Sequence, residues 1–408
     1  MLRVAALLVA GLPAAAADWP QFRGPTGDGH YAGPAIPTEW GPDTNVSWKT
    51  PIPGKGWSSP IVSKGKVYLT TAVPKGDDQS LRAVCIDVGS GKIDWDEEAV
   101  LATQPLTEKV HSKNSQASPT PTTDGDRLYV HFGHMGTAGL DLKGKVLWTR
   151  TGLYSKPVHG SGGSPILVDG LLVFSVDSLD KQALVALDAK TGHTAWETPR
   201  QHKTDRPFSF GTPTVVEVGG KKQIVSEGSD ILAGYDAKSG KEIWRIKFKG
   251  YSVIPKPVAG HGMVFFSTSF DAATVQAIKL GGTGDVTSTH IAWTLGKGAA
   301  PHTPSPLLVG DELYLISDKG QLSCVEAKSG TVVWEDKLKG GYSASPIFAN
   351  GNIYVTSEDG KGTLIKAGRK KEILGEFDLK EKTFASFAAA DGALYVRTES
   401  QFYKFAKR

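Results

Sequence analysis

Tryptophan recurs along this chain at a nearly constant interval. Seven steps cover 329 residues between the first and the last position, so the mean interval is 47 residues. The positions are Trp48, Trp95, Trp148, Trp196, Trp244, Trp293, Trp334 and, in place of an eighth tryptophan, Phe377. A period of about 40 to 50 residues is typical of the four-stranded blades of β-propellers. The spacing therefore predicts a propeller, in which each unit packs on its two neighbours and the units form a ring.

A glycine precedes five of these tryptophans by four residues, and four of the glycines end the pattern Asp/Glu-x-x-Ser/Thr-Gly. The five glycines are Gly91, Gly144, Gly192, Gly240 and Gly330. Acidic and hydroxyl side chains bond the backbone of a tight turn, and glycine accepts the positive φ that closes the turn. The pattern predicts a hairpin in each unit, followed by a strand that carries the tryptophan.

A Ser-Pro pair, or a close variant, opens each unit. Proline has no N–H to donate and is accepted at the first residue of a strand, so each pair predicts the start of the innermost strand of a blade. We assign Ser59-Pro60, Ser118-Pro119, Ser164-Pro165, Thr212-Pro213, Lys256-Pro257, Ser305-Pro306 and Ser345-Pro346 to this position.

The last unit lacks a fourth strand. It extends from Phe384 to Phe405 and ends without a hairpin glycine or a tryptophan, whereas the segment around Trp48 has a strand pattern and no preceding blade. We predict that residues 45–52 complete the last blade and close the ring, since closure covers edge strands that would otherwise pair with other molecules. The expected fold is an all-β, eight-bladed β-propeller with four-stranded antiparallel blades, covering residues 45–408.

The N-terminal residues have the features of a secretory signal. Arg3 precedes an apolar stretch from Val4 to Leu12, which is too short to cross a membrane, and small residues follow it. We predict a signal peptide at residues 1–17 and an extended Gly/Pro-rich arm at residues 18–44. We expect no lipid-anchor cysteine after the signal and no transmembrane segment, hence a periplasmic or secreted protein.

The charge of the chain bears on its partners, and the two cysteines bear on whether it forms a disulfide. The net charge of +4 is spread along the chain without a basic block, so we expect no nucleic-acid partner. Cys85 and Cys324 occupy the same point of the repeat on blades that are not adjacent. A disulfide requires Cα atoms within about 7 Å, so we predict that both cysteines are unpaired and fill buried sites.

The repeat resembles that of a known family. The Ser-Pro openings, the sequence LVALDAKTG at residues 184–192 and the hairpins followed by tryptophan resemble the pyrroloquinoline-quinone-like (PQQ-like) propeller repeat, over residues 45–408. The opening DWPQFRGP at residues 18–25 resembles the N-terminal signature of a secreted bacterial branch of this family. The resemblance implies the propeller fold and leaves the activity open, because this fold supports unrelated functions.

Two branches of that family give contrasting expectations. Quinoprotein dehydrogenases hold the quinone at the propeller centre with adjacent cysteines, a tryptophan floor, a calcium site and an aspartate base, and this chain has no adjacent cysteines. The propeller lipoprotein of the outer-membrane β-barrel assembly machine is similar in size and non-catalytic. It carries a lipid-bearing cysteine that this sequence lacks.

Large side chains precede the predicted inner strands, where the chain crosses between blades and can surround the axis. We predict a ligand-binding site in this axial funnel, and His111 joins it from the long connection at residues 96–117, because flat side chains give contact area at little entropic cost. Its residues are Trp57, His111, Asn114, His159, Phe210, Tyr251, His302 and Tyr342, and Phe384 occupies the same position of the last unit. The alternative is that these side chains plug the channel, which the common structural role of aromatic residues at blade corners favours.

The chain contains no P-loop, no zinc-protease helix motif, no Cys-x-x-Cys pair and no nucleophile elbow. We therefore predict no catalytic residues, no metal ligands and no cofactor. The expected function is that of a monomeric, non-enzymatic binding or protein-interaction scaffold of the periplasm or cell envelope. Its partner would be an envelope protein or a small ligand at the funnel. The alternative is an enzyme that uses the funnel, such as an oxidoreductase that depends on PQQ with calcium.

Overall fold

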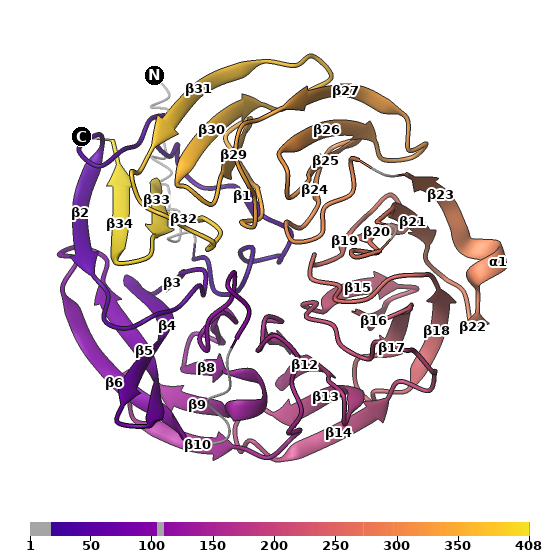
Figure 1. Ribbon diagram of the computed structural model, residues 1–408, viewed down its shortest axis with the longest axis horizontal. Helices are drawn as coiled ribbons and strands as arrows, with labels where there is room; N and C mark the ends of the chain where they lie inside the picture. The colour runs from indigo at the N-terminus through magenta and orange to yellow at the C-terminus, as the bar shows by residue number, and fades with distance from the viewer. Residues whose placement is uncertain (1–17, 104–109, 272, 297, 408) are drawn as a thin grey trace, which may run out of the picture.

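The computed structural model describes residues 18–103, 110–271, 273–296 and 298–407, which form a ring of eight β-sheets (Figure 1). Each sheet contains one four-stranded antiparallel blade, which confirms the predicted eight-bladed propeller. The predicted signal peptide, residues 1–17, lies outside the described residues, as does part of the long connection that follows the first blade.

The first four blades follow the chain in order from the inner to the outer strand. The first blade consists of β3 (Ile61–Ser63), β4 (Lys66–Lys75), β5 (Asp78–Asp87) and β6 (Ile93–Ala102), and the second of β7 (Thr122–Thr123), β8 (Arg127–His131), β9 (Thr137–Asp141) and β10 (Val146–Arg150). The third blade consists of β11 (Ile166–Val168), β12 (Leu171–Asp177), β13 (Gln182–Asp188) and β14 (Thr194–Pro199), and the fourth of β15 (Thr214–Val218), β16 (Lys221–Gly228), β17 (Ile231–Asp236) and β18 (Glu242–Lys247).

The other four blades have the same order, except that the last takes its outer strand from the start of the chain. The fifth blade consists of β19 (Val258–Gly260), β20 (Met263–Ser267), β21 (Val275–Lys279) and β23 (Ile291–Leu295), and the sixth of β24 (Leu307–Val309), β25 (Glu312–Ile316), β26 (Gln321–Glu326) and β27 (Val332–Lys337). The seventh blade consists of β28 (Ile347–Ala349), β29 (Asn352–Thr356), β30 (Lys361–Lys366) and β31 (Ile373–Asp378), and the eighth of β32 (Ala388–Ala390), β33 (Ala393–Arg397), β34 (Gln401–Ala406) and β2 (Val46–Pro51).

A few short elements complete the described chain. Strand β1 (His30–Tyr31) pairs in parallel with β28, and β22 (Gly284–Asp285) pairs in parallel with β18. A 3-10 turn, η1 (Gly133–Met135), and one short helix, α1 (Thr287–His290), are also present. Within the described ranges, no helix has the length and apolar character needed to span a membrane.

The predicted closure of the ring is confirmed. Strand β2 pairs antiparallel with β34, with Trp48 opposite Lys404 and Thr50 opposite Phe402. Figure 1 shows the indigo β2 beside the yellow β34, so both ends of the chain contribute to one blade.

The hairpin glycines have a second role beyond the turn. Gly91 and Gly192 both have φ near 72°, and each lies under the tryptophan of the preceding blade. A Cβ atom at Gly91 would come within 2.6 Å of the Trp48 indole, and one at Gly192 within 2.5 Å of the Trp148 indole. The Trp48 indole N–H donates to Val88 O at 2.9 Å, beside Gly91. Each such contact joins neighbouring blades at the outer rim, which explains why glycine and tryptophan recur together.

Both cysteines are buried and free, as the sequence predicts. Cys85 on β5 and Cys324 on β26 each lie opposite a tyrosine of the adjacent strand, Tyr68 and Tyr314. Burial raises the pKa of each thiol, to about 12 for Cys85 and about 11 for Cys324. These side chains therefore belong to the packing of their blades.

The N-terminal arm, residues 18–44, crosses one end of the ring. Trp19 forms a backbone bridge with Val62 of the first blade, and β1 then lies along β28 of the seventh blade. Trp40 is buried between the seventh and eighth blades, with its ring 4.3 Å from that of Phe377. The arm therefore spans the propeller opening before the chain enters the closing strand.

Candidate functional site

A cavity of about 520 Å³ lies on the propeller axis, and residues from all eight blades line it. Cavities of about 300 to 1,000 Å³ are typical of small-molecule sites. The wall has two kinds of residue, hydroxyl groups beside the start of the inner strands and aromatic and imidazole groups. The N-terminal arm contributes Phe22 to the same cavity.

The hydroxyl ring connects the blades around the axis. We call this ring the collar, and its members are Ser59, Thr120, Ser164, Thr212, Ser305, Ser345 and Ser386. In seven neighbouring pairs of blades, a backbone N–H at this position donates to the hydroxyl oxygen of the next blade at 2.8 to 3.0 Å. The described contacts include no such bond between the fourth and fifth blades, where Lys256 replaces the hydroxyl residue.

The collar corrects the sequence assignment in the second blade. The sequence predicts Ser118-Pro119 as the start of its inner strand, but Thr120 and Pro121 occupy that position, because Thr122 pairs with Tyr129 and Thr120 carries the collar hydroxyl. Ser118 instead accepts a hydrogen bond from Ser115 N at 3.1 Å. The prediction was wrong because two hydroxyl-proline steps follow one another here, and the sequence pattern alone does not distinguish them.

Seven of the eight residues predicted for the funnel line the axial cavity. They are Trp57, His111, Asn114, His159, Phe210, Tyr251 and His302. Phe384 lines it as well, and its ring lies 4.7 Å from that of Trp57. Their role as ligand contacts stays a prediction, but the structure brings them together around one space.

Tyr342 does not line the cavity, so its assignment to the funnel was wrong. Its side chain is 1% exposed, packs in the apolar cluster between the sixth and seventh blades, and donates from its hydroxyl to Lys339 O at 3.2 Å. Its neighbour Ser343 reaches the cavity instead. At this blade, the chain turns its small residue toward the axis and its aromatic residue into the core.

The segment that carries His111 to Asn114 lies over the cavity and is held on both sides. His111 N and Asn114 Nδ2 both donate to His159 O, at 3.2 and 2.8 Å. Lys113 forms an ion pair of 2.7 Å with Glu358 of the seventh blade. His159 itself has φ of 64°, a conformation that costs free energy for a residue with a side chain and is often found at functional sites.

The imidazoles of this region make edge-to-face or tilted ring contacts rather than bonds to hydroxyl groups. The rings of His111 and His159 lie 5.4 Å apart, and the His302 ring lies 4.7 Å from that of Phe270. Burial, together with the nearby His111, lowers the pKa of His159, which favours its uncharged ring. In the described wall, no imidazole forms a hydrogen bond with a side-chain hydroxyl, which is the contact that an activated nucleophile needs.

The acidic side chain of the wall is engaged in structural contacts. Asp318 accepts hydrogen bonds from His302 N and Thr303 Oγ1, at 2.6 and 2.5 Å, one on each carboxylate oxygen. Among the described residues, no group of three or more His, Cys, Asp or Glu side chains could hold a metal ion. The arrangement offers contact area and hydrogen-bond donors.

Several wall residues had no signal in the repeat pattern. Phe22 comes from the arm, which precedes the repeats, and Phe208 and Phe270 lie outside the positions that the period relates. Five of the seven collar hydroxyls were visible in the Ser-Pro or Thr-Pro pairs, but the pattern suggested only a strand start. Their inter-blade hydrogen bonds require knowledge of which blades are neighbours.

A family model described as outer membrane protein assembly factor BamB matches this chain at residues 40–155, 152–251, 180–287 and 271–373. The chain is 26% identical to BamB of Legionella pneumophila over 214 residues, which are 49% of each protein. It is 24% identical to BamB of Yersinia pestis over 219 residues, 47% of this chain and 51% of the relative. The chain therefore spans about half the length of these curated relatives.

Solved structures share the fold. BamB from Moraxella catarrhalis superposes with a TM-score of 0.63 at 12% identity, covering 89% of this chain and 97% of that structure. A europium-containing methanol dehydrogenase superposes with a TM-score of 0.68 at 10% identity, covering 96% and 98%. At these identities the likeness concerns the fold alone.

The cavity does not fit a quinone bound with calcium. Calcium takes six to eight oxygen ligands and commonly several carboxylates, whereas both oxygens of Asp318 are engaged in structural hydrogen bonds. The two cysteines lie on the blade strands β5 and β26 and not in the cavity wall. The donor set of the described wall therefore differs from the one that the quinoprotein branch implies.

Proposed function

Because the chain belongs to the PQQ-like β-propeller family, whose model matches residues between 40 and 373, we propose that it is an exported, non-enzymatic binding scaffold. Its ligand site is the axial cavity, and the propeller serves as a rigid frame around it. The ligand is small, or is a protruding side chain of an envelope protein, because the cavity holds about 520 Å³.

The observation that carries this proposal is the character of the cavity wall. Aromatic rings from several blades, among them Trp57, Phe210 and Tyr251, face one space together with the collar hydroxyls. The charged side chains of the wall are already paired, Lys113 with Glu358 and Asp318 with Thr303. Large apolar surface with a few directed polar groups is the usual composition of a binding pocket.

A location outside the cytoplasm is part of the same proposal. It is supported by the predicted signal at residues 1–17 and by the relatives, which are described as outer membrane protein assembly factors. A partner protein of the cell envelope agrees with that description. We keep the monomeric state as a prediction, to be measured by light scattering.

The cavity-filling variant Ile254→Trp tests whether the cavity is the site. Ile254 is half-buried in the cavity wall, so an indole at this position occupies the space that a ligand would take. Ile373→Trp is the matched control, because Ile373 is 39% exposed on the outer strand β31. Both proteins would be isolated from the native host and examined by native mass spectrometry.

The proposal predicts a bound small molecule, or a cross-linked envelope partner, with the wild type and the control variant and none with Ile254→Trp. Equal recovery with both variants would contradict the axial site. The enzymatic alternative is tested by adding PQQ and calcium to the purified protein. Alcohol- or sugar-dependent reduction of a dye under these conditions would replace the scaffold by an oxidoreductase.

A further inference from the structure

Three cations are buried around the collar without a carboxylate partner. Arg23 and Arg397 are each 1% exposed and Lys256 is 3% exposed. None of them forms an ion pair within the described part of the chain. A buried charge costs free energy unless a partner compensates it, so an uncompensated set of three requires a reason.

Arg200 shows how this protein treats a buried cation that is purely structural. Its guanidinium donates to both oxygens of the buried Asp177, at 2.8 and 3.1 Å. Arg23 instead donates to the backbone oxygens of Asp28 and Pro306, both at 2.7 Å, and Arg397 donates to Ser58 Oγ at 2.9 Å. Among the described residues, only neutral acceptors bond these two arginines, and the Nε atom of each has no hydrogen-bond partner.

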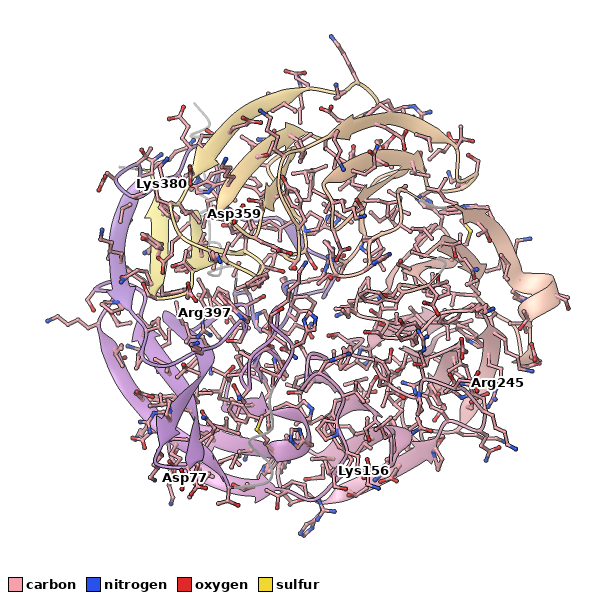
Figure 2. The ribbon with its side chains drawn as sticks, in the orientation of Figure 1. Asp77, Lys156, Arg245, Asp359, Lys380 and Arg397 are labelled. Atoms are coloured by element: carbon pink, nitrogen blue, oxygen red, sulfur yellow. The ribbon has the colours of Figure 1, made fainter. Side chains whose placement is uncertain are left out.

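All three cations adjoin the collar. Arg23 also donates to the backbone oxygen of the collar residue Ser305, at 3.4 Å, and Arg397 bonds Ser58, the neighbour of Ser59. Lys256 occupies the collar position of the fifth blade, and its backbone N–H donates to Ser305 Oγ at 2.9 Å. Figure 2 shows Arg397 toward the centre of the ring, whereas Lys156 lies near its rim.

The environment of these cations favours an added negative charge. Burial lowers the pKa of Arg23 to about 10, of Arg397 to about 9 and of Lys256 to about 7. The carboxyl groups near Lys256 are those of Asp28 and Glu227, and burial raises the pKa of Glu227 well above its ordinary value. Three buried cations therefore lie beside the collar, although none of them is among the described residues that line the cavity.

The collar adds hydrogen-bond donors that the fold does not use. Its hydroxyl oxygens accept backbone N–H groups, which leaves the hydroxyl hydrogens to donate elsewhere. Within the described chain, six of these hydroxyls donate to no acceptor, although all six line the cavity: Ser59, Thr120, Ser164, Thr212, Ser305 and Ser386. Anionic oxygens accept such donors in the strongest hydrogen bonds.

We propose that the collar end of the axial cavity is an anion-binding subsite, and that the cavity takes a small organic acid with an aromatic body. The acid group lies at the collar, near the positive charges of Arg23, Lys256 and Arg397, and the ring lies between the aromatic side chains of the wall. This inference rests on the proposed function and specifies the ligand class of the same cavity. A carboxylate and a phosphate share this chemistry.

Isothermal titration calorimetry with three probes of one shape tests the inference. The probes are 2-naphthoate, 2-naphthyl phosphate and the neutral 2-naphthamide. We expect one or both acids to bind at least about tenfold more tightly than the amide. Only the acids carry a negative charge, which the buried cations attract. The stronger of the two acids identifies carboxylate or phosphate as the source of the anion. Ile254→Trp should abolish the binding of all three.

Lys256→Gln removes one cation. The variant should fold, because a buried lysine without an ion-pair partner does not stabilise the native state. It should weaken the binding of the acids by about tenfold and leave that of the amide unchanged. Lys156→Gln is the control, since it makes the same charge change at an exposed position.

The wild type provides a second measurement. Lys256 is protonated below about pH 7, so the acids should bind more tightly at pH 6 than at pH 8, and Lys256→Gln should lose that part of the dependence. The charged and titratable groups that face this lysine are Arg23, Asp28 and Glu227. His111 and His159 line the cavity in both proteins, so the comparison with Lys256→Gln isolates the contribution of Lys256.

Equal affinity for acids and amide would overturn the anion subsite and leave the axial binding site in place. Absence of binding by all three probes would overturn the inferred ligand class, whereas the proposed function is decided separately by the molecule that the protein carries from its host.

Discussion

Removal of the Trp48 side chain should destabilise the protein more than removal of any equivalent tryptophan inside the chain. Trp48 belongs to the strand that closes the ring, and its ring lies 5.7 Å from that of Phe402 on the other end of the chain. Its N–H donates to Val88 O at 2.9 Å, so one side chain joins the N-terminal strand, the first blade and the last blade.

The expected loss follows from these contacts. Truncation of a fully buried tryptophan to alanine costs about 3 to 5 kcal/mol, and Trp48 is half-buried, so packing accounts for about 2 kcal/mol. The lost hydrogen bond adds about 1 kcal/mol. We therefore expect Trp48→Ala to lower the free energy of unfolding by about 3 kcal/mol.

Trp196→Ala is the matched control. Trp196 holds the same repeat position in the third blade and lies over Gly240, but its N–H has no described acceptor, and its strand continues along the chain on both sides. Urea unfolding followed by tryptophan fluorescence and circular dichroism measures both variants. An unchanged midpoint for Trp48→Ala, or a larger loss for Trp196→Ala, would refute the role assigned to the closing strand.

Two further predictions concern the collar. Thr120→Val leaves Ser59 N–H without its acceptor and should cost about 1 to 3 kcal/mol in urea unfolding, while Thr120→Ser keeps the hydroxyl and should be close to wild type; equal effects would contradict the collar bond. Lys256 has a folded pKa of about 7, below its unfolded value, so the native state gains stability as pH rises from 7 to 8.5, by about 1 to 2 kcal/mol. Chemical denaturation should show this slope in the wild type and not in Lys256→Gln; a slope shared by both would assign it to another group.

The period and the closure of the fold were predictable from the sequence because both depend on local patterns. The tryptophan interval and the hairpin glycines mark each blade, and the unpaired segment around Trp48 matched the incomplete last unit. These patterns arise from contacts that repeat in every blade, such as the indole over Gly91. A contact that repeats leaves a period that can be read from one sequence.

The candidate site was predictable only in part because it depends on contacts that do not repeat. The position before the inner strand identified most of the cavity wall, but at Tyr342 the aromatic ring turns into the core, and the repeat carries no signal for that choice. Phe22 and Arg23 reach the axis from an arm outside the repeats. Lys256 read as an irregular variant of Ser-Pro, and its burial beside Arg23 emerges only when the ring is closed.

In the proposed axial site, the acid group of the ligand lies at the collar. A crystal structure of the protein with 6-bromo-2-naphthoate tests this placement most directly, because bromine is located by its anomalous signal. The account predicts one bromine peak in the axial cavity, with the carboxylate directed toward the collar residues Ser59, Thr120 and Ser386. A peak confined to the outer surface of the blades, or a carboxylate directed away from the collar, would contradict it.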